Sequence, residues 1–187
     1  MSTNPPILLL DTNVWLDLFL PHRPNRDTVL DLIDEARARD VSLAYPAQAL
    51  LDVYQKVRSD NKRWIRQTRE LTELDARAIK RMAWDYINMM REFATAIPVD
   101  AHDVALACHY RDSHDDLEDD LVLAACQRAH ATYLVSSDEA LAAHAPIACK
   151  TPQEMLELLR SGRLRQAETD DAGEPQDWFY RWLATWG

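Results

Sequence analysis

Four carboxylates in this sequence stand where a predicted strand ends or a predicted helix begins. They are Asp11, Asp52, one acid of the stretch 115–120 and Asp138. Carboxylates that share one crevice repel one another unless cations neutralise them, and oxygen ligands of this kind select Mg²⁺ or Mn²⁺. Such an ion lowers the pKa of its bound water and stabilises charge on a phosphate. The set would therefore suit the hydrolysis of phosphodiester bonds.

Two of these carboxylates follow apolar runs that are typical of buried strands. The run Ile7–Leu10 ends at Asp11, and the apolar residues 132–135 are followed by Ser136, Ser137 and Asp138. In open parallel sheets the ligand crevice lies at the carboxyl ends of the strands. We therefore expect Asp11 and Asp138 to face one crevice if the two strands are neighbours.

Each carboxylate also has a purely structural explanation. Asp11 would serve as a helix cap, Asp138 as a turn residue, and most of the acidic stretch 115–120 as a solvated helix start. Asp52 is harder to explain in this way, because an unpaired carboxylate among apolar neighbours is costly to bury. The conjunction of the four positions favours the functional interpretation.

Strands and helices alternate along the rest of the chain. Further strands are expected at 41–44 and 148–151, and helices at 27–39, within the mostly helical stretch 56–97, and at 100–110, 116–130 and 152–159. This alternation predicts an α/β fold, with helices on both faces of a central, mainly parallel sheet. We expect this domain at residues 1–163, a polar linker at 164–177 and a tryptophan-rich helical tail at 178–187.

Composition excludes several other functions. The only glycines are Gly162, Gly173 and Gly187, so no glycine-rich dinucleotide or nucleoside-triphosphate loop exists in the body of the chain. Three cysteines without a CxxC pair fit a reducing compartment. The N-terminal apolar run is cut by Asp11, and no apolar run is long enough to cross a membrane. We expect a soluble, cytoplasmic protein.

The net charge of -10 would repel polyanions on average, but the charge is unevenly spread. Nine basic and four acidic residues fall between Lys56 and Arg81, which gives this segment +5. Arg58, Lys62, Arg66 and Arg69 recur at the spacing of one helical face. They would contact nucleic-acid phosphates, with Lys62, Arg63 and Arg66 as the favoured residues, and Trp64 would stack on a base. The alternative is a solvated helical face with Trp64 tucked beneath it.

Several motifs together resemble those of PIN-domain nucleases, over residues 6–160. The opening motif is the segment 8–14, with Asp11 followed by Thr12 and Asn13. The late motif is the pair of segments 116–119 and 133–138, whose spacing is similar to that of the branch that includes VapC-type toxins. Segment 49–54 looks like the middle motif, with Asp52 in place of the usual glutamate, and segment 151–156 looks like the closing helix.

The resemblance implies roles for particular residues. Metal-binding and catalytic acids are expected at Asp11, Asp52, Asp119 and Asp138, with support from Asn13 and from the hydroxyl of Ser136. Counting back from Asp138 as in a different PIN branch would select Asp120 instead of Asp119. Glu118 is expected to be exposed or to contact a partner.

The function implied is a metal-dependent endoribonuclease, the toxin of a type II toxin–antitoxin pair, held in check by an antitoxin protein. A non-catalytic PIN-like interaction module and a metal-dependent phosphoesterase of small substrates remain alternatives. The tail, with Trp178, Trp182 and Trp186 on one helical face, would pack on its own domain or form a homodimer or partner contact.

Overall fold

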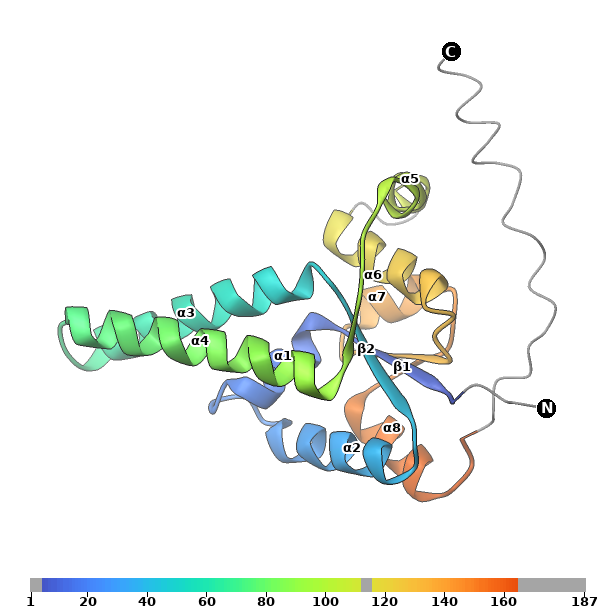
Figure 1. Cartoon of the computed structure of the whole chain (residues 1–187), viewed down its shortest axis with the longest axis horizontal. Coiled ribbons are helices and arrows are strands. Elements are labelled where there is room, and N and C mark those ends of the chain that lie inside the picture. Colours follow the sequence, from blue (N-terminus) through green and yellow to red (C-terminus); the bar gives the residue numbers. More distant parts are fainter. Residues whose placement is uncertain (1–4, 112–115, 165–187) are drawn as a thin grey trace, which may run out of the picture.

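The computed structural model describes residues 5–111 and 116–164 (Figure 1). Within these residues, five parallel strands form one sheet in the order β3-β2-β1-β4-β5. The strands are β1 (Ile7–Leu10), β2 (Ser42–Pro46), β3 (Thr95–Ile97), β4 (Tyr133–Val135) and β5 (Cys149–Lys150). The helices are α1 (Thr12–Phe19), α2 (Arg26–Ala38), α3 (Ala49–Thr68), α4 (Glu73–Phe93), α5 (Ala101–Tyr110), α6 (Leu117–Arg128), α7 (Glu139–His144) and α8 (Pro152–Arg160).

Strand β1 lies at the centre of the sheet and is buried on both faces. Successive side chains of a strand point to opposite faces, so the two faces of β1 enter different cores. Leu8 and Leu10 belong to the core formed with α1, α2 and α8, whereas Leu9 packs with residues of α6 and α7. The continuous apolar run of β1 thus follows from helices on both sides, and the predicted three-layer α/β/α fold is confirmed.

Helices α3 and α4 form a hairpin that projects from the sheet (Figure 1). The stretch 56–97 was expected to be mostly helical, and it is, but the helix is interrupted between Thr68 and Glu73. The break is fixed by a capping box, in which Thr72 and Asp75 each bond the backbone N–H of the other. The same stretch also contains β3, whose residues are too few and too exposed to show a strand pattern.

The expected C-terminal linker and tail lie mostly beyond these ranges. Of the linker, only Leu164 is described, and the tail 178–187 lies outside the described residues. In the described part of the chain, no helix is both long enough and apolar enough to cross a membrane.

Candidate active site

The strand order reverses between β1 and β4. The chain runs outward from β1 through β2 and β3 and then returns to the other side of β1. At such a switch point the connections leave neighbouring strands in opposite directions, which opens a crevice at the carboxyl ends. Leu10 pairs with Val135, and the N–H of Asp11 donates to the Val135 carbonyl at 3.0 Å. The two strands are therefore neighbours, which meets the condition for Asp11 and Asp138 to share one crevice.

The Ser136 hydroxyl joins these two aspartates. Its Oγ donates to Asp11 Oδ2 at 2.9 Å and accepts from the backbone N–H of Asp138 at 3.0 Å. Ser136 and Asp11 are both buried, and Asn13 Nδ2 faces Asp11 Oδ2 at a longer 3.4 Å. The hydroxyl thus fixes the orientation of the Asp11 carboxylate relative to the loop that carries Asp138.

Burial raises the pKa of the Asp11 carboxyl, because desolvation disfavours its charged form. The hydrogen bond from Ser136 acts in the opposite direction, and the negative charge of Asp138 adds to the rise. Asp11 occupies the N-cap position of α1, yet its side chain makes no capping hydrogen bond. The backbone N–H groups of Thr12 and Asn13 nevertheless lower the pKa of this carboxyl, so the start of α1 helps to stabilise its charge.

Asp138 is half-buried and does cap a helix. Its Oδ1 accepts from the backbone N–H groups of Ala140 at 2.8 Å and Leu141 at 3.1 Å, at the start of α7. Among the described residues, every hydrogen bond to its carboxylate falls on Oδ1, so Oδ2 is left as a ligand atom. The structural and the functional explanations of Asp138 are thus compatible.

A second group of charges lies between α3 and the start of α6. Burial raises the pKa of the half-buried Asp52 carboxyl, and the neighbouring charge of Lys56 lowers it. Lys56 Nζ lies 3.9 Å from Glu118 Oε1. Burial also raises the pKa of Glu118, and the negative charges of Asp52 and Asp11 add to this rise. Glu118 is therefore close enough to interact electrostatically with two of the four predicted acids, Asp52 and Asp11.

Three consecutive acids at the start of α6 face different surroundings, because neighbouring helical residues point about 100° apart. Glu118 faces Asp52 and Lys56. Asp119 is half-buried, and its N–H donates to Asp116 Oδ1 at 3.3 Å. Asp120 is buried, and its charge raises the pKa of Tyr110 on α5, although burial of the phenol is the main cause. Sequence reasoning assigned Glu118 no catalytic role, and the only signal for one is its position beside the other two acids.

The carboxylates form two pairs, Asp11 with Asp138 and Asp52 with Glu118, and the charges of Asp11 and Glu118 couple the two pairs. Within residues 5–111 and 116–164, no three His, Cys, Asp or Glu side chains are arranged to hold a metal ion. Asp11 is linked to Asp138 through Ser136, and Asp52 to Glu118 through their charges. All four side chains offer oxygen, the donor that Mg²⁺ and Mn²⁺ prefer.

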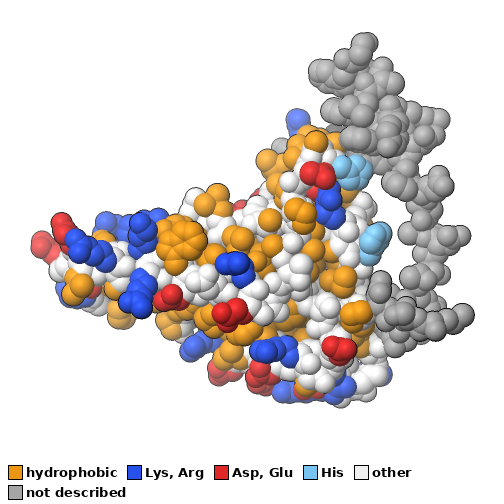
Figure 2. All heavy atoms as spheres, in the orientation of Figure 1, with side chains coloured by type: hydrophobic (Ala, Val, Ile, Leu, Met, Phe, Trp, Pro, Cys, Tyr) orange, Lys and Arg blue, Asp and Glu red, His pale blue; other side chains and the backbone are white. Residues whose placement is uncertain are grey.

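Basic side chains gather over the α3–α4 hairpin (Figure 2). Lys62, Arg63 and Arg66 lie on α3 and form no ion pair with any described residue. Arg63 and Arg66 follow Asp52 by 11 and 14 residues, which is three and four helical turns. Asp52 and these two arginines therefore share one face of the helix.

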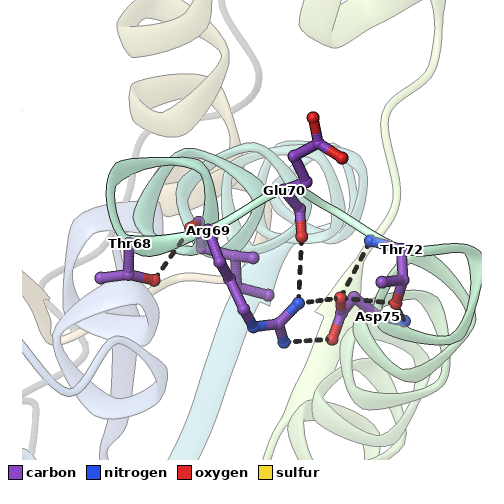
Figure 3. Close-up of polar contacts among 6 residues, drawn as sticks. Thr68, Arg69, Glu70, Thr72 and Asp75 are labelled. Atoms are coloured by element: carbon purple, nitrogen blue, oxygen red, sulfur yellow. Dashed lines mark hydrogen bonds and ion pairs between the residues drawn. The ribbon is translucent and has the colours of Figure 1, made fainter.

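The basic face differs from the expected set of Arg58, Lys62, Arg66 and Arg69. The Arg69 guanidinium donates to both carboxylate oxygens of Asp75, at 2.6 and 2.7 Å (Figure 3). The Arg58 guanidinium lies over the Tyr54 ring at 5.0 Å. Both arginines are thus engaged within the hairpin, because they lie at the turn and at the packing surface between α3 and α4.

Trp64 is 63% exposed, so it is not tucked beneath the basic face. It lines a cavity between α3 and the connection that follows α1. An exposed aromatic ring offers a face on which a base can stack.

Comparison with known families matches residues 8–140 to the model of the PIN domain. Among solved structures, the chain is similar to one in VapBC2 from Rickettsia felis bound to a DNA fragment from their promoter. The TM-score is 0.54, with 15% identity, over 78% of this chain and 98% of that one. It is also similar to a chain of FitAcB from Neisseria gonorrhoeae, with a TM-score of 0.52 and 18% identity, over 78% and 97% of the two chains. No curated protein matches. At such identities, the structural likeness shows a common fold.

Proposed function

Because this chain belongs to the PIN-domain family, we propose that it is a metal-dependent endoribonuclease that hydrolyses RNA phosphodiester bonds. One observation carries the proposal. A buried carboxylate, Asp11, lies at the switch point of the sheet and is joined through Ser136 to Asp138. Asp52 and Glu118 bring further negative charge to the same edge.

The donor set fits a divalent cation. The Asp11 carboxylate is buried among other acids, so without a cation its charged form is disfavoured. Asp11, Asp52, Asp138 and one of Glu118, Asp119 and Asp120 would hold the ion. When bound, Mg²⁺ or Mn²⁺ would lower the pKa of a water and stabilise negative charge on the phosphate.

The remaining steps depend on the protein's own side chains. Ser136 orients Asp11, and the backbone N–H of Asp138 orients Ser136 in turn. Lys56 on α3 brings a positive charge close to the carboxylates of Asp52 and Glu118. A phosphodiester at this edge is thereby placed between fixed carboxylates and the start of the basic face.

A polymeric substrate is favoured over a small phosphate ester. Arg63 and Arg66 lie about 16 and 21 Å along α3 from Asp52, at 1.5 Å per residue. A small ester bound at the acids would not reach them, whereas a strand of RNA would place phosphates beside them. Binding through these arginines would weaken as the salt concentration rises.

The biological role follows from the same family. Two of the similar structures are VapBC2 and FitAcB, which supports the proposal of a toxin of a toxin–antitoxin pair with an antitoxin protein as partner. A homodimer contact through the tail 178–187 stays a prediction. A non-catalytic interaction module is the alternative that a cleavage assay decides.

The test is cleavage of single-stranded and structured RNAs with Mg²⁺ or Mn²⁺, comparing the wild type with Asp11→Asn and Asp138→Asn. We expect both variants to lose at least about 100-fold in cleavage rate, because each removes a carboxylate that is proposed to hold the metal ion. Asp31→Asn is the control, since Asp31 is an exposed carboxylate paired with Arg160 on α8. Equal rates for all four proteins would exclude the site, and no cleavage by the wild type would favour the interaction module.

A further inference from the structure

A cavity of about 360 Å³ lies beside α3, and none of the carboxylates of the candidate active site lines it. It is lined by Leu20, Pro21, His22, Asp60, Asn61 and Trp64. Its volume is at the lower end of the range for ligand sites, about 300–1,000 Å³. One wall is the connection between α1 and α2, and the other is the middle of α3.

The wall opposite α3 is held in place from beneath. Asp17 is buried near the end of α1 and accepts hydrogen bonds from Arg23 Nη1 at 3.0 Å and Asn25 Nδ2 at 2.9 Å. These two bonds fix both sides of the connection that carries Pro21 and His22. The cavity is therefore formed before any ligand binds, which lowers the cost of ordering it.

The aromatic surface of the cavity is exposed to solvent. Trp64 is 63% exposed, although a large apolar ring in water is unfavourable. Unpaired RNA bases stack on aromatic side chains, and such stacking contributes to affinity whatever the base. Lys62 and Arg63 precede Trp64 on α3 but point about 160° and 100° away from it around the helix, so they would contact phosphates outside the cavity.

The polar groups of the cavity are mainly acceptors. The Asp60 carboxylate lies 3.8 Å from His22 Nε2, so it is not saturated by a short hydrogen bond from that ring. Asn61 Nδ2 donates to the Val57 carbonyl at 2.8 Å, which leaves the amide Oδ1 as an acceptor. Guanine presents two adjacent N–H donors on its Watson–Crick edge, and a carboxylate accepts from both. Uracil presents a single N–H between two carbonyl oxygens, which the carboxylate would repel.

The cavity lies on the same helix as Asp52 and the basic face, but it is turned away from them. Asp60 and Trp64 follow Asp52 by 8 and 12 residues, which is about 12 and 18 Å along α3 and about 80° and 120° around it. An RNA strand that leaves the carboxylates would reach the cavity by crossing from one face of α3 to the next. We propose that this cavity is a base-recognition subsite for an unpaired guanine in single-stranded RNA. Trp64 stacks on the base, and Asp60 accepts hydrogen bonds from its edge. This inference rests on the proposed function, since it names a feature of the same substrate.

The experiment measures binding of labelled single-stranded hexaribonucleotides to the full chain by fluorescence anisotropy, with EDTA present to prevent cleavage. One oligonucleotide contains only uracil, and three others carry a single guanine, adenine or cytosine. The variants are Trp64→Ala, Trp64→Phe and Asp60→Asn. The matched control is Trp84→Ala, because Trp84 is also an exposed tryptophan of the hairpin, at 53%, but contacts the Tyr54 ring outside the cavity.

We expect the guanine oligonucleotide to bind about tenfold more tightly than the uracil one, as for a good bidentate contact. Trp64→Ala should weaken binding of the guanine oligonucleotide by about fivefold or more, and Trp64→Phe should restore most of it. Asp60→Asn should remove the preference for guanine while binding of the uracil oligonucleotide stays the same. Trp84→Ala should bind like the wild type.

Two failures can be told apart. Salt-sensitive binding that ignores the base and is unchanged by Trp64→Ala would overturn the subsite and leave the proposed function intact. The cavity would then be available for a side chain of a protein partner. A wild type that binds none of the oligonucleotides would overturn the subsite together with the proposed nucleic-acid function.

Discussion

The carboxyl edge of the sheet and the α3–α4 hairpin differ in how deeply they bury the side chains that are proposed to be functional. At the sheet edge, Asp11 and Ser136 are buried and bonded to each other across neighbouring strands. On the hairpin, Arg63, Trp64 and Arg66 are exposed. The groups proposed for chemistry are therefore fixed by the core, whereas the groups proposed for RNA contact can be changed with little effect on folding.

The largest contrast is expected in stability. Leu10→Ala removes a fully buried side chain beside Asp11 and should lower the free energy of unfolding by about 3 kcal/mol. Leu74→Ala, at a residue 77% exposed near the hairpin turn, should change it by less than about 0.5 kcal/mol. Urea denaturation followed by circular dichroism measures both. Equal decreases would show that the hairpin is as much a part of the core as β1.

The next prediction concerns the Ser136 hydroxyl, which orients a proposed metal ligand without being one. Ser136→Ala removes the hydroxyl that orients Asp11 and should lower the cleavage rate about 10–100-fold, as for other groups that orient metal ligands. Ser137→Ala is the matched control, because Ser137 is the next residue and is exposed. The readout is the cleavage rate as a function of Mn²⁺ concentration. If both serine variants cleave at the same rate, the proposed role of Ser136 is wrong.

On the hairpin, a charge change should alter binding but not folding. Arg66→Glu should weaken RNA binding and reduce the slope of log K against log salt by about 0.7 for each phosphate that the protein no longer neutralises. Arg77→Glu is the control, because Arg77 lies on α4 and pairs with Glu73 at 3.6 Å. Binding titrations between low and moderate salt measure the slope. A slope unchanged by Arg66→Glu would place the RNA elsewhere.

The smallest effect is expected at the turn of the hairpin, whose contribution to stability should depend on pH. The Arg69 guanidinium and the Thr72 hydroxyl hold the pKa of the Asp75 carboxyl well below its usual value of 3.8. A carboxyl whose pKa is lower in the folded state stabilises that state above pH 3.8, and this contribution disappears as the pH falls below it. The difference in thermal stability between the wild type and Asp75→Asn should therefore shrink as the pH is lowered from about 5 to about 2. A constant difference would mean that the ion pair does not form in solution.

Much of the fold was predictable because its strongest signals are local. The apolar run Ile7–Leu10 and the apolar residues before Ser136 report strands covered on both faces, and both strands are present. Strand β3 left no such signal, since its two leading residues are exposed at the edge of the sheet. The helix break at 69–72 contains no glycine or proline, because capping by Thr72 and Asp75 replaces them.

The candidate site was less predictable than the fold. That β1 and β4 are neighbours cannot be seen in either segment alone, and it is what brings Asp11 near Asp138. Among Glu118, Asp119 and Asp120, a shift of one residue turns the side chain by about 100°, so spacing alone cannot choose between them. Whether Asp119 or Asp120 is the third acid stays a prediction, and Glu118 joins them as a candidate.

The single uninterrupted helix α3 carries Asp52 near its start and Arg66 in its last turn. A helix cannot stretch without breaking its hydrogen bonds, so the separation of these residues, about 21 Å, is nearly constant. The proposed enzyme would therefore have a minimum substrate length. Oligonucleotides that span this separation would bind at full strength, and shorter ones would reach the carboxylates without reaching the distal arginines.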